Sequence, residues 1–360
     1  MVVIFQQELL MEYSKVLNYK NFPASPKLLG SGLIVRLSNR TLRCNFITKF
    51  CGFLWILLNI CTFAASAQQD PQVSQHMFNH LMINPGFAGN NGQINLMLFN
   101  RQQWVGFPGA PVTTSFQTDA AVKLIGNSDG LGFTVVKDAI GYEKNVSFGI
   151  DYAYRFQLGQ GQLGCGISVG MMNKNISPGW SSSQGGDLVD GSDPYLPKQE
   201  VNGLLTDVGA GFFYRHKEYY LALSSTHINQ PSFSFEEKGH YSLKRHYYLT
   251  GSYNKGMNDD RFAVQPSFFI KSDGTTSQVD LDLLIQYNRR FWGGIGYRIK
   301  DAVVVFLGFE MLNGLKIGYS YDLNTSVLAR YNSGSHELFI SYAVLLNKNR
   351  GQKTKSVRFL

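Results

Sequence analysis

Alternation of apolar and polar residues with a period of two recurs through the chain after residue 92, in segments of about ten residues. In the segment 277–288, Val279 and Leu281 lie on one side of an extended chain. Asp280 and Asp282 lie on the other side. Successive side chains of a β-strand point to opposite faces of its sheet, so this period is typical of strands. The pattern predicts an all-β protein.

Fourteen such segments can be counted along the chain. They cover residues 93–103, 112–122, 130–138, 144–158, 161–173, 201–216, 218–228, 244–255, 260–271, 277–288, 291–299, 302–311, 314–323 and 335–346. Single-chain bacterial membrane barrels have an even number of antiparallel strands. We therefore predict a transmembrane antiparallel up-and-down β-barrel of about 14 strands over residues 93–347, followed by a C-terminal tail, 348–360.

The lengths of the connections sort by parity. Even-numbered connections are brief, whereas the odd-numbered ones include the three longest, 174–200, 229–243 and 324–334. An outer-membrane barrel with a periplasmic N-terminus has short periplasmic turns and longer external loops. A soluble β-sandwich has no reason to sort its loops in this way, so the parity favours a membrane barrel.

Alternation alone does not show which face of the strands lies inside. Aromatic residues favour an apolar face toward lipid, because they recur near the predicted strand ends as in interfacial girdles. Examples are Trp104, Tyr142, Tyr219, Tyr247 and Phe291. The polar face then lines the lumen, and we predict that it is braced by ion pairs and tyrosines. The candidate luminal ion-pair residues are Asp151, Arg155, Asp207, Arg215, Asp280, Asp282, Arg298, Glu310 and Glu337, with Asp119, Lys316 and Asp322 on the same face.

Three glycines share the inward face of one predicted strand. They are Gly164, Gly166 and Gly170, and they would leave room for a neighbouring backbone or a plug.

Residues 1–67 are predicted to be an N-terminal extension and signal peptide. An apolar run, 50–67, follows several basic residues and ends in Ala65-Ser66-Ala67, which predicts cleavage before Gln68. A true transmembrane anchor is the alternative, for which the run is slightly short.

Removal of this leader changes the charge and cysteine inventory. Residues 1–67 hold 7 of the 33 Lys and Arg and 2 of the 25 Asp and Glu, which leaves 26 basic and 23 acidic residues. The remaining net charge of +3 gives no support for a nucleic-acid partner. Only Cys165 of the four cysteines remains, which excludes an intramolecular disulfide framework and a cysteine metal site.

The stretch 68–92 is rich in Asn, Gln, His and Pro and precedes the first predicted strand. Ser74 could cap a short helix that ends at Asn84-Pro85-Gly86. We predict a periplasmic segment that acts either as a plug or docking element or as a strap closing the barrel mouth. Its candidate partner or plug residues are Gln75, Phe78, Asn79, Asn84, Pro85 and Phe87.

Catalytic motifs are not found. The neighbours His336 and Glu337 would point to opposite faces of a strand and cannot share a ligand. No G-x-S-x-G, P-loop or H-E-x-x-H sequence occurs. We predict no catalytic residues, no cofactor and no metal site.

Four stretches carry a resemblance to a known family. The first runs from 69 to 89, with SQHMFN and INPGFAG, and the others are RQQWVGFPGAP (101–111), GYSYD (318–322) and NSGSHE (332–337). Together they resemble the PorP/SprF family of the type IX secretion system, found in gliding and protein-secreting bacteria of the Bacteroidetes group. The chain departs from the family's usual Tyr at His76 and Pro at His80, and its tail ends in Phe359-Leu360 instead of Tyr-Phe.

The resemblance implies a non-enzymatic barrel of the cell outer membrane that assists protein secretion or gliding motility. Implied partners are periplasmic ring or lipoprotein components of the secretion system, a secreted surface adhesin and outer-membrane lipid. A porin-like or small-solute transport barrel is the alternative, and an outer-membrane enzyme is a weaker one.

Overall fold

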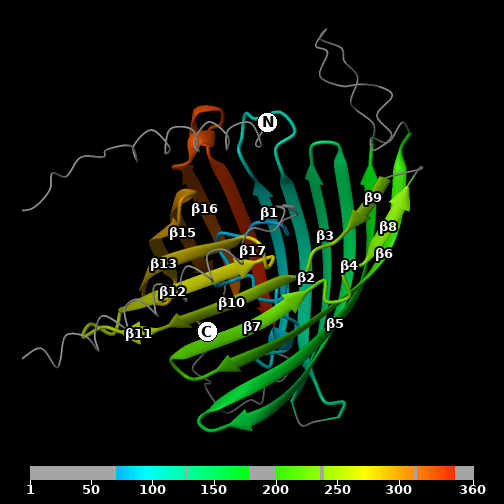
Figure 1. The fold of residues 1–360 in the computed structure, drawn as a ribbon. Helices are drawn as coiled ribbons and strands as arrows, with labels where there is room; N and C mark the ends of the chain where they lie inside the picture. Colours follow the sequence, from blue (N-terminus) through cyan, green and yellow to red (C-terminus); the bar gives the residue numbers. More distant parts are fainter. Residues whose placement is uncertain (1–69, 126–127, 178–198, 236–238, 312–313, 345–360) are drawn as a thin grey trace, which may run out of the picture. The chain divides into compact units, whose positions relative to one another are not determined.

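Fourteen strands of the computed structural model pair into one closed antiparallel barrel (Figure 1). They are β1 (Ile94–Gln102), β2 (Val112–Val122), β3 (Asp129–Ile140), β4 (Glu143–Leu158), β5 (Gly161–Ile176), β6 (Val201–Arg215), β7 (Tyr219–Thr226), β10 (His246–Tyr253), β12 (Phe262–Ser272), β13 (Ser277–Tyr287), β14 (Phe291–Arg298), β15 (Ala302–Met311), β16 (Leu315–Asn324) and β17 (Ser335–Val344). The barrel closes because β1 pairs with both β2 and β17. The predicted fold and strand number are confirmed, with strand ends shifted by at most a few residues.

The structure describes residues 70–125, 128–177, 199–235, 239–311 and 314–344. All of them belong to one compact unit, Phe63–Leu360. The predicted leader, 1–67, and the predicted tail, 348–360, lie outside the described residues.

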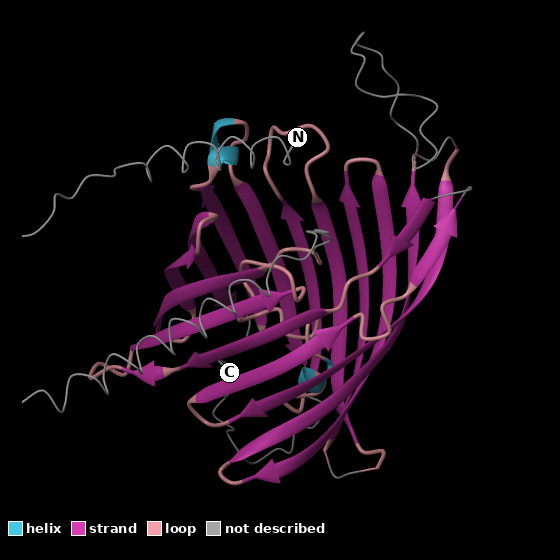
Figure 2. Ribbon diagram, viewed as in Figure 1, coloured by secondary structure: helices cyan, strands magenta, loops and turns pink. Residues whose placement is uncertain are grey.

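Shorter elements occupy the connections and the start of the described chain (Figure 2). The long connection between β7 and β10 carries a two-stranded hairpin. These elements are the 3-10 helices η1 (Pro85–Phe87) and η2 (Val327–Arg330), the hairpin β8 (Ser232–Phe235) and β9 (Gly239–Ser242), and β11 (Lys255–Gly256). Among the described residues, no helix is long and apolar enough to cross a membrane.

The two faces of the wall differ in polarity. Large apolar side chains point outward and are solvent-accessible, as for Leu204 (69% exposed) and Ile150 (63%). Charged side chains point inward and are buried, as for Asp322 and Glu337, both 0% exposed. An apolar exterior around a polar interior is the arrangement of a membrane barrel, because the outer surface faces lipid.

Candidate functional site

The described N-terminal residues lie inside the barrel, where they form a plug that we define as residues 70–91 (Figure 1, blue). Its start, Asp70, hydrogen-bonds to Thr226 at the end of β7, where the long connections lie. Its end is near the short turns, where Gly89 N donates to Asp119 Oδ2 at 2.7 Å. The segment thus runs along the lumen. This course is that of a plug, the first of the two predicted alternatives, and not of a strap across one mouth.

Five charged residues of the wall form a buried group that we call the ionic cluster. Arg101 of β1 contacts Asp322 at 2.7 Å and Glu337 at 3.0 Å. Arg298 of β14 contacts Asp280 at 3.0 Å and Asp322 at 2.9 Å. Arg101 lies directly opposite Glu337 in the sheet register, and Arg298 lies opposite Asp280. Strand pairing therefore brings these charges together.

The plug enters the ionic cluster through Ser74 and Gln75. The Ser74 hydroxyl donates to Asp322 at 2.8 Å and accepts from the guanidinium groups of both arginines, at 2.9 and 2.8 Å. The backbone N–H groups of Ser74 and Gln75 donate to the two oxygens of Glu337, at 2.8 and 2.7 Å. Burying a charged group without hydrogen-bond partners costs folding free energy. The plug lowers this cost because it supplies hydrogen bonds that water would otherwise make to the cluster.

Farther along the plug, four wall glycines form a surface that we call the glycine cradle: Gly130, Gly164, Gly166 and Gly211. A Cβ atom on Gly130 would overlap the carbonyl of Ala88, and one on Gly166 would overlap the backbone of Pro85 and Gly86. The cradle therefore lets the plug backbone lie directly against the wall. The sequence predicted this use for Gly164 and Gly166, whereas a Cβ on Gly170 would meet the neighbouring strand at Phe148.

The turn η1 is fixed by side chains of the plug and the wall. The Asn84 side chain caps η1 by accepting from Gly86 N at 2.9 Å, and Pro85 occupies the first helical position. The side-chain amide nitrogen of Asn84 donates to the Phe212 carbonyl at 3.0 Å. Arg155 donates to the carbonyls of Phe87, at 2.8 Å, and Ala88.

Aromatic packing fills the lumen beside β14 and β17. The ring of Phe78 lies between Trp292 and Phe339, with both centroid distances 5.1 Å. These rings belong to a buried cluster that also holds Phe99 and Phe306. The lumen therefore holds an apolar core beside its ion pairs, which the sequence did not predict.

A buried histidine of the plug sits in an aromatic cage. The His80 ring lies 5.0 Å from Phe87, 5.2 Å from Phe213 and 4.7 Å from Tyr220, measured between centroids. Among the described residues, both ring nitrogens of His80 are buried without a hydrogen-bond partner. The site is therefore suited to a neutral ring.

We expect His80→Glu to unseat the plug, whereas His80→Phe retains it. A carboxylate without a partner in this cage should cost at least about 3 kcal/mol of folding free energy, and a phenyl ring keeps the packing. Digestion of the purified barrel with proteinase K, which cleaves after apolar and aromatic residues, measures plug release, because the plug holds several such residues and no Lys or Arg. Equal resistance of the two variants would contradict the expectation.

The remaining predicted residues are spread along the lumen. Asn79 accepts from Gln117 at 2.7 Å, and Asp282 contacts His76 at 2.7 Å. Asp151 is buried on β4, whereas Arg215 is half-buried at the end of β6. Glu310, also half-buried, lies opposite Lys316 in the register of β15 and β16. The structure thus gathers Asp280, Arg298, Asp322 and Glu337 in the ionic cluster and leaves the other predicted charges outside it.

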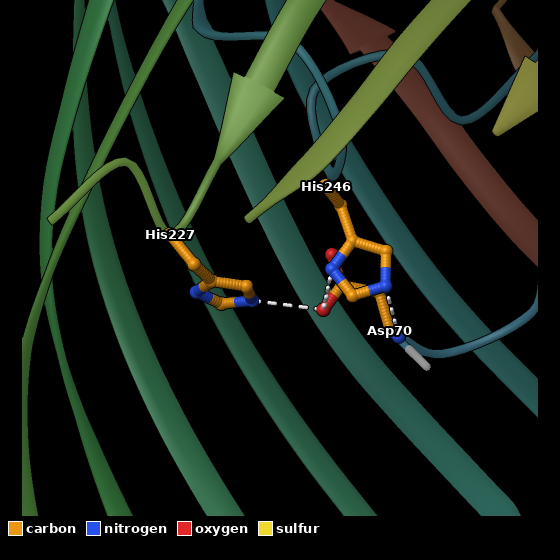
Figure 3. Close-up of side chains that lie close together, drawn as sticks. All are labelled: Asp70, His227 and His246. Carbon is orange, nitrogen blue, oxygen red and sulfur yellow. Dashed lines mark hydrogen bonds and ion pairs between the residues drawn. The ribbon is translucent and has the colours of Figure 1, made fainter. Parts of the chain in front are cut away.

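The start of the plug is held by a second polar group (Figure 3). The Asp70 carboxylate accepts from the hydroxyls of Tyr248 and Thr226, and its Oδ1 lies 2.8 Å from His227 Nε2. On the other side of that ring, Asp207 Oδ1 lies 2.9 Å from His227 Nδ1. Burial acts against the charged imidazole, but the two carboxylates outweigh it and raise the pKa of His227 to about 10.

Several of these residues were not predicted from the sequence. Arg101 lies in a strand whose inward face also carries Met97 and Phe99, so alternation did not single it out. Asp70 meets His227 across 157 residues of chain, a separation that no local motif reveals. The excess of polar and histidine residues in 68–92 was the only available signal.

The plug borders two cavities. One of about 510 Å³ lies toward the long connections, between the plug and strands that include β3, β4 and β5. The other, of about 130 Å³, lies between the plug, β1 and residues near the short turn at Gly314. Leu81 of the plug lines both.

Solved outer-membrane barrels resemble the fold. Omp33 of Acinetobacter baumannii matches with 7% identity, 71% of this chain and 99% of that chain covered, and a TM-score of 0.42. The Pseudomonas putida toluene transporter TodX matches with 11% identity, 79% and 96% covered, and a TM-score of 0.46. The comparison with curated proteins found no match.

A family description fits most of the chain. Residues 65–342 match the family described as "Type IX secretion system membrane protein PorP/SprF". This range contains the plug and nearly all of the barrel, and the predicted resemblance is confirmed. The closed barrel with its apolar exterior is consistent with residence in the outer membrane. The chain therefore belongs to the PorP/SprF family of type IX secretion system membrane proteins.

Proposed function

We propose that this protein assists type IX secretion through protein contacts, as a non-enzymatic barrel whose lumen is closed by its own plug. Its partners would be periplasmic ring or lipoprotein components of the system, and its client could be a secreted surface adhesin. The observation that carries the proposal is the anchoring of the plug along the lumen, from the ionic cluster to the glycine cradle.

The anchoring argues against a role as an open pore. An open porin lines its lumen with solvated polar side chains. Here Gln75 and His76 of the plug are 0% exposed, and the plug packs against both charged and aromatic side chains of the wall. A barrel with an occupied lumen offers its turns, loops and plug ends to other proteins. The porin-like alternative therefore has less support.

Complementation of a strain that lacks the gene tests the secretion role. We expect the amounts of extracellular and surface-attached proteins to fall in the deletion strain and to return with the intact gene. Intact secretion in the deletion strain would contradict the proposal. Cross-linking in intact cells, followed by mass spectrometry, would identify the neighbouring components.

The double substitution Asn84→Ala with Pro85→Ala tests the plug in the same strain. Loss of the η1 cap and of the Phe212 hydrogen bond should weaken plug seating by about 2 kcal/mol. We expect reduced partner co-purification and reduced secretion at near-normal barrel abundance. Unchanged abundance, co-purification and secretion would contradict a role for this turn.

A further inference from the structure

Two histidines of the wall and one aspartate of the plug converge at the end of the lumen nearest the long connections (Figure 3). One ligand atom each from Asp70, His227 and His246 lies within 4.8 Å of the others. The two histidines are 6% and 2% exposed. Imidazole and carboxylate groups are the nitrogen and oxygen ligands of zinc and related transition metals. We propose that these residues bind one such ion, for which Zn²⁺ is the probe, and that it latches the plug to the wall.

The distances suit an ion of this size. Asp70 Oδ1 lies 2.8 Å from His227 Nε2 and 3.7 Å from His246 Nδ1. Tetrahedral zinc with bonds of about 2.0–2.2 Å places its ligand atoms about 3.3–3.5 Å apart. The distances from Asp70 to the two imidazoles therefore bracket the separation that tetrahedral coordination requires. The ion would replace the hydrogen bond between His227 Nε2 and Asp70 Oδ1.

The surroundings orient two of the ligands. Tyr248 and Thr226 donate to Oδ2 of Asp70, which leaves Oδ1 facing the two imidazoles. Asp207 lies beside Nδ1 of His227 and so directs Nε2 toward Asp70. A carboxylate behind a histidine ligand is a common second layer of zinc sites. Lys271 does not compete for the carboxylate, because its ammonium donates to the Asp70 carbonyl and to Gln72.

Two features determine how tightly the site should bind zinc. Coordination through His246 Nδ1 would replace its 3.0 Å contact with the Lys244 carbonyl. Three protein ligands also leave a fourth position to water, as in open zinc sites. We therefore expect a micromolar dissociation constant, weaker than that of a closed structural site. Because only Asp70 comes from the plug, a bound ion would cross-link the plug to β10 and to the residue after β7.

Zinc titration of the purified intact barrel, stripped with a chelator and monitored with a fluorescent zinc indicator, tests the proposal. We expect one ion per chain, with affinity lowered at least about tenfold by His227→Gln or His246→Gln. Asp207→Asn should weaken binding less than either histidine change. His240→Gln is the matched control, because His240 is exposed on β9 and should not alter binding.

Equal zinc affinity in the His227→Gln/His246→Gln double variant and the unaltered barrel would overturn the proposal, as would substoichiometric binding. Heat-dependent gel mobility verifies that each variant is folded. If a histidine variant does not fold, Asp70→Asn provides the same test from the plug side and leaves the wall unchanged. X-ray absorption should show imidazole scattering around the ion, and its absence would equally count against the site.

Discussion

Replacing Arg298 with Met should destabilise the barrel by about 3–5 kcal/mol, because it leaves buried carboxylates without their cation. Arg298 is 1% exposed and contacts both Asp280 and Asp322. It also donates to Ser74, so the plug loses one of its anchors. Guanidinium unfolding of the barrel in detergent, followed by tryptophan fluorescence, measures the change.

Arg261→Met is the matched control for this prediction. Arg261 pairs with Asp259 at 2.7 Å, but the Arg261 side chain is 62% exposed. Solvent screens exposed pairs, so the unfolding midpoint should stay unchanged. The ionic cluster would not have the role assigned to it if the two substitutions gave the same midpoint.

Replacing Gly166 with Val should expel the plug while leaving the barrel wall folded. Valine favours strands, so β5 itself should tolerate the change. Its Cβ would nevertheless overlap the plug backbone at Pro85 and Gly86. Neither the plug backbone nor the paired strand can move away without breaking its hydrogen bonds and packing contacts. The overlap therefore destabilises the seated position of the plug.

Thiol labelling measures this effect. With Cys165→Ser as background, Asn79→Cys places a thiol in the plug at a position that is 1% exposed. We expect a maleimide to label this thiol at least about tenfold faster in the Gly166→Val variant. A tenfold increase corresponds to a decrease of about 1.4 kcal/mol in the free energy of releasing the plug. Gly149→Ala is the control, since its Cβ would lie 3.7 Å from Ser168 Oγ, an ordinary contact. Equally slow labelling in all three proteins would contradict the cradle.

The barrel could be predicted from the sequence because its information is local. Alternation identifies each strand, and turn residues separate one strand from the next. The segment 112–122 coincides with β2, and 302–311 coincides with β15. The positions of the aromatic residues predicted that the polar face of the strands lines the lumen. The burial of Asp322 and Glu337 agrees with this prediction.

The course of the plug could not be predicted in this way. Ser74 meets Glu337 across 263 residues, and Asp70 meets His246 across 176. Contacts of this separation depend on the closed barrel, and nothing in the local spacing of these residues selects them. The proposed metal site could not be predicted for the same reason. The two histidines and Asp70 come from three separate segments, so no local motif brings them together.

Conductance of the purified intact protein in planar lipid bilayers shows whether the plug closes the barrel. We expect no steady ion current from the unaltered barrel and a steady current when Gly166→Val expels the plug. A steady open-channel current from the unaltered barrel, not increased by Gly166→Val, would contradict it.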